Sequence, residues 1–310
     1  MVALSRSQQI ELYRIESFQT HLAYVARVYL EPWAALLGAA GGGPAAESRL
    51  AVIVDDRPTP HLRSCVLNTL LMGRLGWRVK WFTSPQALAA SRQLVADLGP
   101  WVEVIGIAVD GAEALSWQAY NTLLKDPQFW RMLETERVLT FQVDTLLIEP
   151  PEEEVFAYDY VGSPWARGRI LSMDFPIYSA ELELQGVEWE SRALCGTTPQ
   201  GVINGNGGLS VRHCERMAEI AERCSSPPEE PEDIFFARCL AAVSIKAVLP
   251  PLPVVQRFSC ETQAQRCSGA HAAWRYLAAG EVAELLERHL KQVMALTAIG
   301  VATSRVAEGR

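Results

Sequence analysis

The feature that most constrains this chain is an alternation of buried-strand and helix patterns between residues 50 and 144. Short apolar runs typical of buried strands alternate with longer stretches whose apolar residues recur at helical spacing. The expected strands are residues 51–54, 79–82, 102–107 and 137–140, and the helices between them are residues 62–75, 85–98 and 117–133. Repeated strand–helix units predict an α/β fold, with a mainly parallel sheet covered by helices on both faces.

A single carboxylate, Asp144, stands where the last of these strand patterns breaks into the polar sequence FQVDT at 141–145. Ligands of open α/β sheets bind in the crevice beyond the carboxyl ends of the strands. A cation such as Mg²⁺ or Mn²⁺ needs oxygen ligands, and one or two carboxylates suffice when phosphates supply the others. Asp144 is therefore a candidate for holding a metal-bound diphosphate, and the alternative is an aspartate that only ends a strand.

Composition excludes some classes of protein. The chain has 310 residues, of which 49% are hydrophobic, so it can bury the core of one large domain or two small ones. Its formal net charge of -8 disfavours a protein whose task is to bind nucleic acid. The seven cysteines are scattered without a CxxC pair, which suggests reduced packing residues rather than disulfides or a zinc site.

The two ends of the chain differ from its centre. Residues 5–37 carry apolar positions at helical spacing and lead into a Gly- and Ala-rich stretch, and residues 281–301 have an apolar helix face. We expect a helical extension and linker at 1–46, the main α/β domain at 47–277, and a helix and tail at 278–310. The helices would pack on the core or on a second subunit in a homodimer. No signal peptide or transmembrane span is expected, which favours a cytoplasmic protein.

A glycine-rich segment, GVINGNGG at 201–208, precedes a strand pattern and a helix expected from about residue 214 to residue 223. Its last residues are candidates for binding a ligand because glycine lets the backbone approach closely or adopt positive φ. These candidates are Asn204, Gly205, Asn206, Gly207 and Gly208. A tight turn is the equal alternative. The segment does not match the dinucleotide-binding GxGxxG pattern, and no Walker motif occurs.

Two acidic groups complete the candidates. The run EEPED at 229–233 stands directly before a helix pattern, where acids stabilise the helix N-terminus or where a carboxylate could be held as a general base. Asp55 and Arg57 follow the first strand, in position to contact a nucleoside or its diphosphate. Arg57 could instead pair with the neighbouring aspartates.

Six blocks together resemble a known family. They are YNTLL at 120–124, FW at 129–130, LTFQVDTLL at 139–147, YDYVGSPW at 158–165, NGGLSVR at 206–212 and EDIFF at 232–236. In order and number they resemble a family of microbial and fungal proteins catalogued as a domain of unknown function and regarded as glycosyltransferases of the GT-A type. The resemblance spans residues 50–277 and reaches neither end of the chain.

The resemblance implies a GT-A-like, Rossmann-like domain that uses a nucleotide-sugar donor and a saccharide or other hydroxyl acceptor. Asp144 would occupy the last position of an Asp-x-Asp metal motif, whose first position here is Gln142. His271 would complete the coordination of Mn²⁺ or Mg²⁺. One carboxylate fewer than usual weakens this metal site, although the amide of Gln142 can offer an oxygen.

The chemistry of glycosyl transfer then assigns further roles. The acceptor hydroxyl must lose its proton as it attacks, and we expect Asp233, or next Glu232, to take it. A base on the face opposite the leaving group predicts inversion at the anomeric carbon. Trp165 is a candidate for stacking on a sugar face, and packing in the core is its alternative.

Two other classes of function stay open. A non-catalytic carbohydrate-binding or scaffold protein could keep this fold, since fold does not establish activity and one carboxylate of the metal motif is missing. A metal-dependent phosphohydrolase would use acids and a histidine on a similar sheet, but two-metal sites need several clustered ligands, and the acids here are scattered.

Overall fold

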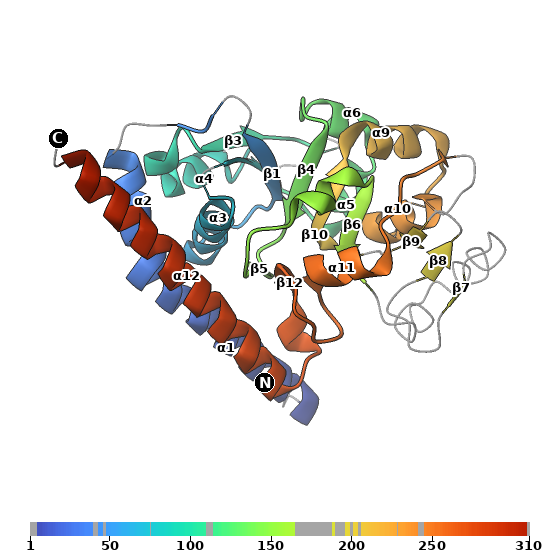
Figure 1. Ribbon diagram of the computed structural model, residues 1–310. Helices are drawn as coiled ribbons and strands as arrows, with labels where there is room; N and C mark the ends of the chain where they lie inside the picture. Colours follow the sequence, from blue (N-terminus) through green and yellow to red (C-terminus); the bar gives the residue numbers. More distant parts are fainter. Residues whose placement is uncertain are drawn as a thin grey trace.

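The computed structural model describes residues 5–39, 43–45, 48–74, 76–109, 114–164, 188–189, 196–198, 201–203, 206–227, 229–240 and 245–308. A six-stranded sheet in the order β3-β2-β1-β4-β10-β6 forms its centre (Figure 1). Its strands are β1 (Arg49–Val54), β2 (Trp77–Thr83), β3 (Val102–Gly106), β4 (Arg137–Phe141), β6 (Tyr160–Ser163) and β10 (Asn206–His213). The first four are parallel, and β10 is antiparallel to both β4 and β6.

Helices cover both faces of this sheet, as the alternation of patterns predicts. Along β1, Ala51 and Ile53 face one hydrophobic core, whereas Leu50, Val52 and Val54 face the other. The first core packs against α1 (Arg6–Val25), α3 (Pro60–Met72) and α12 (Ala279–Glu308). The second packs against α5 (Trp117–Leu124), α6 (Pro127–Arg131), α9 (Cys214–Arg223) and α10 (Glu232–Leu240). The expected α/β class is confirmed.

Two smaller sheets flank the centre. The strands β5 (Thr145–Leu147), β11 (Ser259–Cys260) and β12 (Gly269–His271) pair in the order β11-β12-β5. The second small sheet contains β7 (Glu188–Trp189), β8 (Gly196–Thr198) and β9 (Gly201–Ile203). Because β5 follows β4 after three residues, the first small sheet brings β12 to the carboxyl edge of the central sheet.

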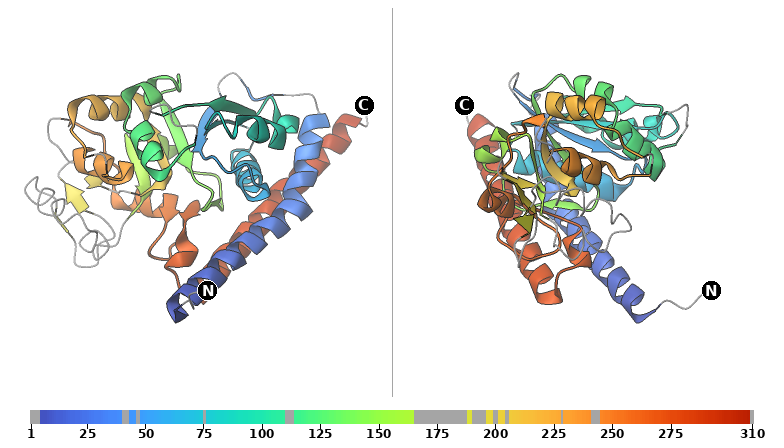
Figure 2. Two further views of the ribbon diagram at one scale, coloured as in Figure 1. Left: turned by 180° about the vertical axis from the view of Figure 1, so that it is seen from behind. Right: turned by 90° about the vertical axis from the view of Figure 1, so that its right-hand side faces the viewer.

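The terminal helices lie side by side (Figures 1 and 2). From Arg6 the chain is helical through α1, the π-helical turn η1 (Ala26–Leu30) and α2 (Glu31–Ala39), and α12 runs along it. Phe18 and Leu22 of α1 are fully buried in the same core as α3. The N-terminal helix is thus packed on the α/β core, while the expected domain boundaries stay predictions. Within the described residues, no helix is both long enough and apolar enough to cross a membrane.

Two predicted helices differ from those observed. The helix expected over 117–133 is broken into α5 and α6, because Asp126 caps α6 through the backbone N–H of Gln128 and Pro127 occupies its first turn. The helix expected over 85–98 is only α4 (Leu88–Leu94) followed by the 3-10 turn η2 (Ala96–Leu98).

The remaining short elements are the 3-10 turns η3 (Glu153–Ala157) and η5 (Ala273–Arg275) and the helix α11 (Leu252–Phe258). Helix α9 begins and ends at the residues that its sequence pattern predicts.

Candidate functional site

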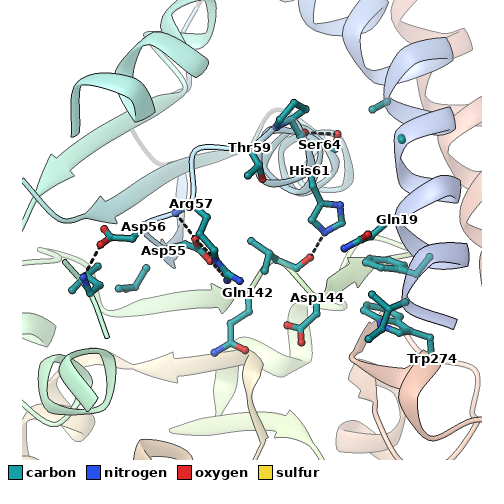
Figure 3. Close-up of a pocket in the computed structure, with 18 of the residues that line it drawn as sticks. Gln19, Asp55, Asp56, Arg57, Thr59, His61, Ser64, Gln142, Asp144 and Trp274 are labelled. Carbon is teal, nitrogen blue, oxygen red and sulfur yellow. Dashed lines mark hydrogen bonds and ion pairs between the residues drawn. The ribbon is translucent and has the colours of Figure 1, made fainter. Parts of the chain in front are cut away.

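A cavity of about 1190 Å³ opens at the carboxyl ends of β1 and β4 (Figure 3). Residues 55–57 after β1 and residues 142–144 after β4 line it, together with the start of α3. The N-terminal helices form another part of its wall through Gln19 of α1, Arg27 of η1 and Glu31 of α2. The cavity therefore lies where open α/β sheets bind their ligands.

Asp144 belongs to this cavity wall and is part of a small polar cluster. Its Oδ1 lies 3.2 Å from Nε2 of His271, and its Oδ2 lies 3.8 Å from Nη2 of Arg275. Burial raises the pKa of the Asp144 carboxyl, but the charge and hydrogen bond of His271, together with the charge of Arg275 and a backbone hydrogen bond, outweigh burial and lower this pKa to about 2. Asp144 is therefore negatively charged at every physiological pH.

His271 is brought to Asp144 by strand pairing, because β12 runs antiparallel to β5 and pairs His271 with Thr145. Its Nε2 also lies 3.2 Å from Oε1 of Gln142, whose amide nitrogen donates to the hydroxyl of Tyr120 at 2.9 Å. Burial lowers the pKa of His271, but Asp144 and then Glu261 and Asp233 together raise it by more, so the net pKa lies above the ordinary value of 6.5. Asp144, Gln142 and His271 form what we call the Asp144 cluster.

The glycines of β10 explain how His271 fits beside this strand. A Cβ at Gly208 would lie 2.6 Å from Cε1 of His271 and closer still to its Nε2. A Cβ at Gly207 would overlap Glu232 and Arg212 and would approach Cβ of Asp233 to 3.2 Å. The space beside both glycines is filled by protein side chains, which accounts for glycine here without a ligand. A role of these residues in substrate binding stays a prediction.

Glu232 is held in a buried ion pair. Nη1 and Nη2 of Arg212 donate to its two carboxylate oxygens at 2.5 and 3.0 Å, and both side chains are inaccessible to solvent or nearly so. The guanidinium also lies over the rings of Trp130, Tyr160 and Phe236. Because both of its oxygens are engaged, Glu232 is less suited to accept a proton than its neighbour in the chain.

That neighbour, Asp233, has a different environment in the first turn of α10. Its carboxylate accepts hydrogen bonds from the backbone N–H of Ile234 at 2.9 Å and of Gly207 at 3.4 Å. Burial, followed by the adjacent charge of Glu232, raises the pKa of Asp233 to about 7, although Arg212 opposes this shift. A carboxyl with such a pKa can both accept and release a proton near neutral pH.

The loop after β1 is organised by its own acids. Asp55 is buried and pairs with Arg57, whose Nη2 and Nε lie 2.5 and 3.0 Å from the carboxylate oxygens. Asp56 accepts from the backbone N–H of Ser84 and of Leu115, and these bonds lower its pKa although burial opposes them. Arg57 could contact a diphosphate or pair with a neighbouring aspartate, and in the structure it pairs with Asp55. The exposed fraction of its side chain is 68%, and this side chain lines the cavity.

Several candidates are not part of this geometry. Trp165, Asn204 and Gly205 lie outside the described residues. Among the residues that the structure does describe, no group of three or more His, Cys, Asp and Glu side chains is placed to hold a metal ion. The Asp144 cluster supplies one carboxylate, one imidazole and one amide oxygen instead.

Reasoning from sequence missed three residues that shape the site. Tyr120 orients the amide of Gln142, Arg212 holds Glu232, and the buried Glu261 lies 3.8 Å from the other ring nitrogen of His271. A signal for Arg212 was available, since an arginine inside the apolar strand pattern LSVRH at 209–213 needs a buried acidic partner. Tyr120 and Glu261 have no such signal.

Comparison with known proteins gives one family match. The profile described as "Protein of unknown function (DUF5672)" matches residues 110–275, whereas no curated protein matches the chain. This match supports the expected membership of a domain-of-unknown-function family, and the assignment of that family to microbial and fungal GT-A-type enzymes stays a prediction. The matched segment contains Asp144, Asp233 and His271 but not α1 or β1.

Among solved structures, the galactosyltransferase LgtC in complex with donor and acceptor sugar analogs is similar to this chain. The TM-score is 0.43 at 11% sequence identity, and the alignment covers 81% of this chain and 96% of LgtC. A similarity at this level leaves the activity of this chain open.

Proposed function

We propose that this chain, which belongs to the DUF5672 family, is a glycosyltransferase that moves a sugar from a nucleotide-diphosphate sugar to an acceptor hydroxyl. The observation that carries the proposal is a pair of carboxyl groups with opposite pKa shifts that both act on His271: Asp144 contacts its Nε2, and the charge of Asp233 raises its pKa. The pKa of Asp144 is lowered to about 2, and the pKa of Asp233 is raised to about 7. Pairs of titratable groups whose environments push their pKa values apart are typical of catalytic sites.

The donor would bind in the cavity beside Asp144. The Asp144 cluster fits Mn²⁺ or Mg²⁺ that takes the rest of its ligands from water and a diphosphate, because such ions are commonly held by one or two carboxylates. When bound, the ion would stabilise the negative charge that grows on the departing diphosphate. Arg57 and Arg275 both line the cavity, and their partly exposed guanidiniums could reach phosphate oxygens there.

The acceptor would be activated by Asp233. With a pKa of about 7, its carboxylate is available in a large fraction of molecules at neutral pH and can take the proton of the attacking hydroxyl. Single-step attack assisted by such a base inverts the anomeric configuration. In this proposal Glu232 positions Arg212 and the backbone of Gly207, while Trp165 and residues 204–208 help to shape the sugar and acceptor sites.

Binding measurements test the donor site beside Asp144, and turnover measurements test Asp233 as the base. Calorimetric titration of the purified protein with UDP, GDP, CDP and their sugar conjugates, with and without Mn²⁺, should reveal one preferred nucleotide. Asp144→Ala should abolish the metal-dependent part of that binding. Asp233→Asn should bind the donor as the unchanged protein does but transfer no sugar. If Asp144→Ala bound the nucleotide in the presence of Mn²⁺ as tightly as the unchanged protein does, the proposed donor site would be wrong.

The stereochemical part of the proposal has its own test. Proton NMR of the first product formed should show an anomeric configuration opposite to that of the donor. A product with retained configuration would exclude Asp233 as the base of a single displacement.

A non-catalytic carbohydrate-binding or scaffold function is the second candidate. It is favoured by Gln142, a neutral amide where the metal motif has its first acid, since the Asp144 cluster then holds only one carboxylate. Such a protein would bind sugars or sugar nucleotides without turnover, and Asp233→Asn would leave its binding unchanged.

Association through the terminal helices is a further part of the proposal. Tyr13 of α1 is 69% exposed and Ile10 is 45% exposed, so this helix presents apolar side chains that a second copy could cover. Sedimentation analysis of the unchanged protein against Ile10→Lys/Tyr13→Lys would test a homodimer. If the unchanged protein sedimented as a monomer at all concentrations, the proposed homodimer would be wrong.

A further inference from the structure

The buried imidazole of His271 has two chemically different sides. Nε2 faces the Asp144 cluster, with Oδ1 of Asp144 and Oε1 of Gln142 both at 3.2 Å. Nδ1 faces the opposite way, into the protein, and has no hydrogen-bond partner among the described residues. Buried polar atoms are nearly always paired, so an unpaired ring nitrogen at a candidate metal site requires an explanation.

Glu261 is the acidic group on that inner side. Its Oε1 lies 3.8 Å from Nδ1 of His271, and 2% of its side chain is exposed. Strand pairing fixes this arrangement, because β11 and β12 are parallel and pair Ser259 with Gly269 and Cys260 with Ala270. Continued by one residue, the same register sets Glu261 beside His271.

Metal ligation would change what the inner nitrogen needs. To bind a cation, Nε2 must present its lone pair, so the single ring proton of a neutral imidazole must reside on Nδ1. A buried N–H requires an acceptor, and Oε1 of Glu261 is a carboxylate oxygen 3.8 Å from Nδ1. A shift of about 1 Å would bring the pair from 3.8 Å to ordinary hydrogen-bond length.

We propose that Glu261 is a positioning residue that accepts a hydrogen bond from Nδ1–H of His271 and thereby directs the Nε2 lone pair at a divalent cation beside Asp144. This inference rests on the proposed metal-assisted function. Carboxylates behind ligating histidines fix the tautomer and the orientation of the ring. Glu261 would thus compensate in part for the missing carboxylate at Gln142, by strengthening the histidine ligand rather than by adding a ligand.

Metal affinity tests this role without any turnover. Mn²⁺ would be titrated calorimetrically into the purified full-length chain, alone and with inorganic pyrophosphate, and ¹⁴N coupling to the bound Mn²⁺ would be read by electron spin-echo spectroscopy. We expect Glu261→Leu to bind Mn²⁺ about 10- to 100-fold more weakly and to lose most of the ¹⁴N coupling. Glu261→Gln, which keeps an acceptor oxygen, should lie between Glu261→Leu and the unchanged protein.

Two further variants separate the outcomes. Glu103→Gln removes one charge from the exposed side of β3 and should bind Mn²⁺ like the unchanged protein. His271→Gln gives the affinity and spectrum of a site without its histidine. Circular dichroism and thermal unfolding of each variant show whether it is folded.

The possible results distinguish this inference from the function on which it rests. If the unchanged protein binds Mn²⁺ with ¹⁴N coupling and the folded Glu261 variants do the same, Glu261 has no positioning role and the proposed function stands. If the unchanged protein binds no Mn²⁺ even with pyrophosphate, metal assistance fails and the role of Glu261 fails with it. If Glu261→Leu is unfolded, the comparison of Glu261→Gln with the unchanged protein decides, and equal affinity refutes the inference.

Discussion

Replacement of Gly208 by alanine tests whether the imidazole of His271 occupies the position on which the candidate site depends. The added Cβ would lie 2.6 Å from Cε1 of His271, whereas non-bonded carbons normally stay 3.5–4.0 Å apart. Cδ2 and Nε2 of the ring would lie closer still, so the ring would have to move by more than about 1 Å. It cannot move freely, because β12 is paired with β5 and the backbone N–H of Ala272 donates to the carbonyl oxygen of Asp144 at 2.8 Å.

The size of the effect follows from this overlap. Overpacking a filled interior costs about 1–3 kcal/mol. For a chain of 310 residues, an unfolding entropy of about 2.1 cal/mol/K per residue gives about 0.65 kcal/mol/K, so Tm should fall by about 2–5 °C. Displacement of His271 should also weaken its pairing with Asp144 and raise the pKa of that carboxyl above about 2.

Differential scanning fluorimetry measures the first effect, with Gly280→Ala as the matched control. A Cβ at Gly280 would meet nothing within 4 Å, and alanine is the better helix former, so this variant should keep or slightly raise Tm. Mn²⁺ titration measures the second effect, since a displaced His271 should weaken binding. An unchanged Tm together with unchanged Mn²⁺ affinity in Gly208→Ala would refute the packing of His271 against β10.

Three further results are expected. Arg212→Met should cost about 3–5 kcal/mol in urea unfolding, because it leaves the Glu232 carboxylate buried without its partner, and a second change, Glu232→Leu, should recover much of this loss. Because the pKa of Asp233 is raised from 3.8 to about 7, the stability that this group contributes should be present below pH 3.8 and lost as pH rises through about 7, whereas the rate of sugar transfer should increase over the same range. Asp233→Asn should remove this pH dependence of stability, and a pH dependence that persists in the variant would show that another group causes it. Gln142→Asp should tighten Mn²⁺ binding by restoring a second carboxylate beside Asp144, and calorimetry showing equal or weaker binding would contradict the assignment of the metal position.

Periodicity predicts the layers of this protein well because the central strands β1 and β4 of the parallel sheet are buried on both faces. The apolar run of β1 divides alternately between two cores, which is why a continuous apolar sequence identifies it as a central strand. The sequence also contains a signal for the break between α5 and α6, because Asp126 followed by Pro127 is typical of a helix start. Asp144 and His271, which are far apart in the chain, lie 3.2 Å from each other, and their roles stay predictions.

Other features of the site cannot be read from local sequence. The distinction between Glu232 and Asp233 depends on Arg212, which reaches Glu232 from β10 across the fold. The glycines at 207 and 208 look like a ligand-binding or turn segment, yet the groups that fill the space beside them come from α10, β10 and β12. Such contacts join residues far apart in the chain, and only the tertiary structure specifies which of them meet.

The helix that begins at Arg6 has a consequence for how this site can diversify. Phe18 stacks on Trp274 with ring centroids 3.5 Å apart, and both residues line the cavity together with Gln19 and Arg27. The family profile starts at residue 110, so this wall lies outside the matched segment that holds Asp144. Substitutions in the N-terminal helix would therefore alter the shape of the pocket without changing Asp144, Gln142 or His271. Removal of residues 1–46 alone would uncover Trp274 and widen the pocket, while β1, β4 and the Asp144 cluster would stay in the chain.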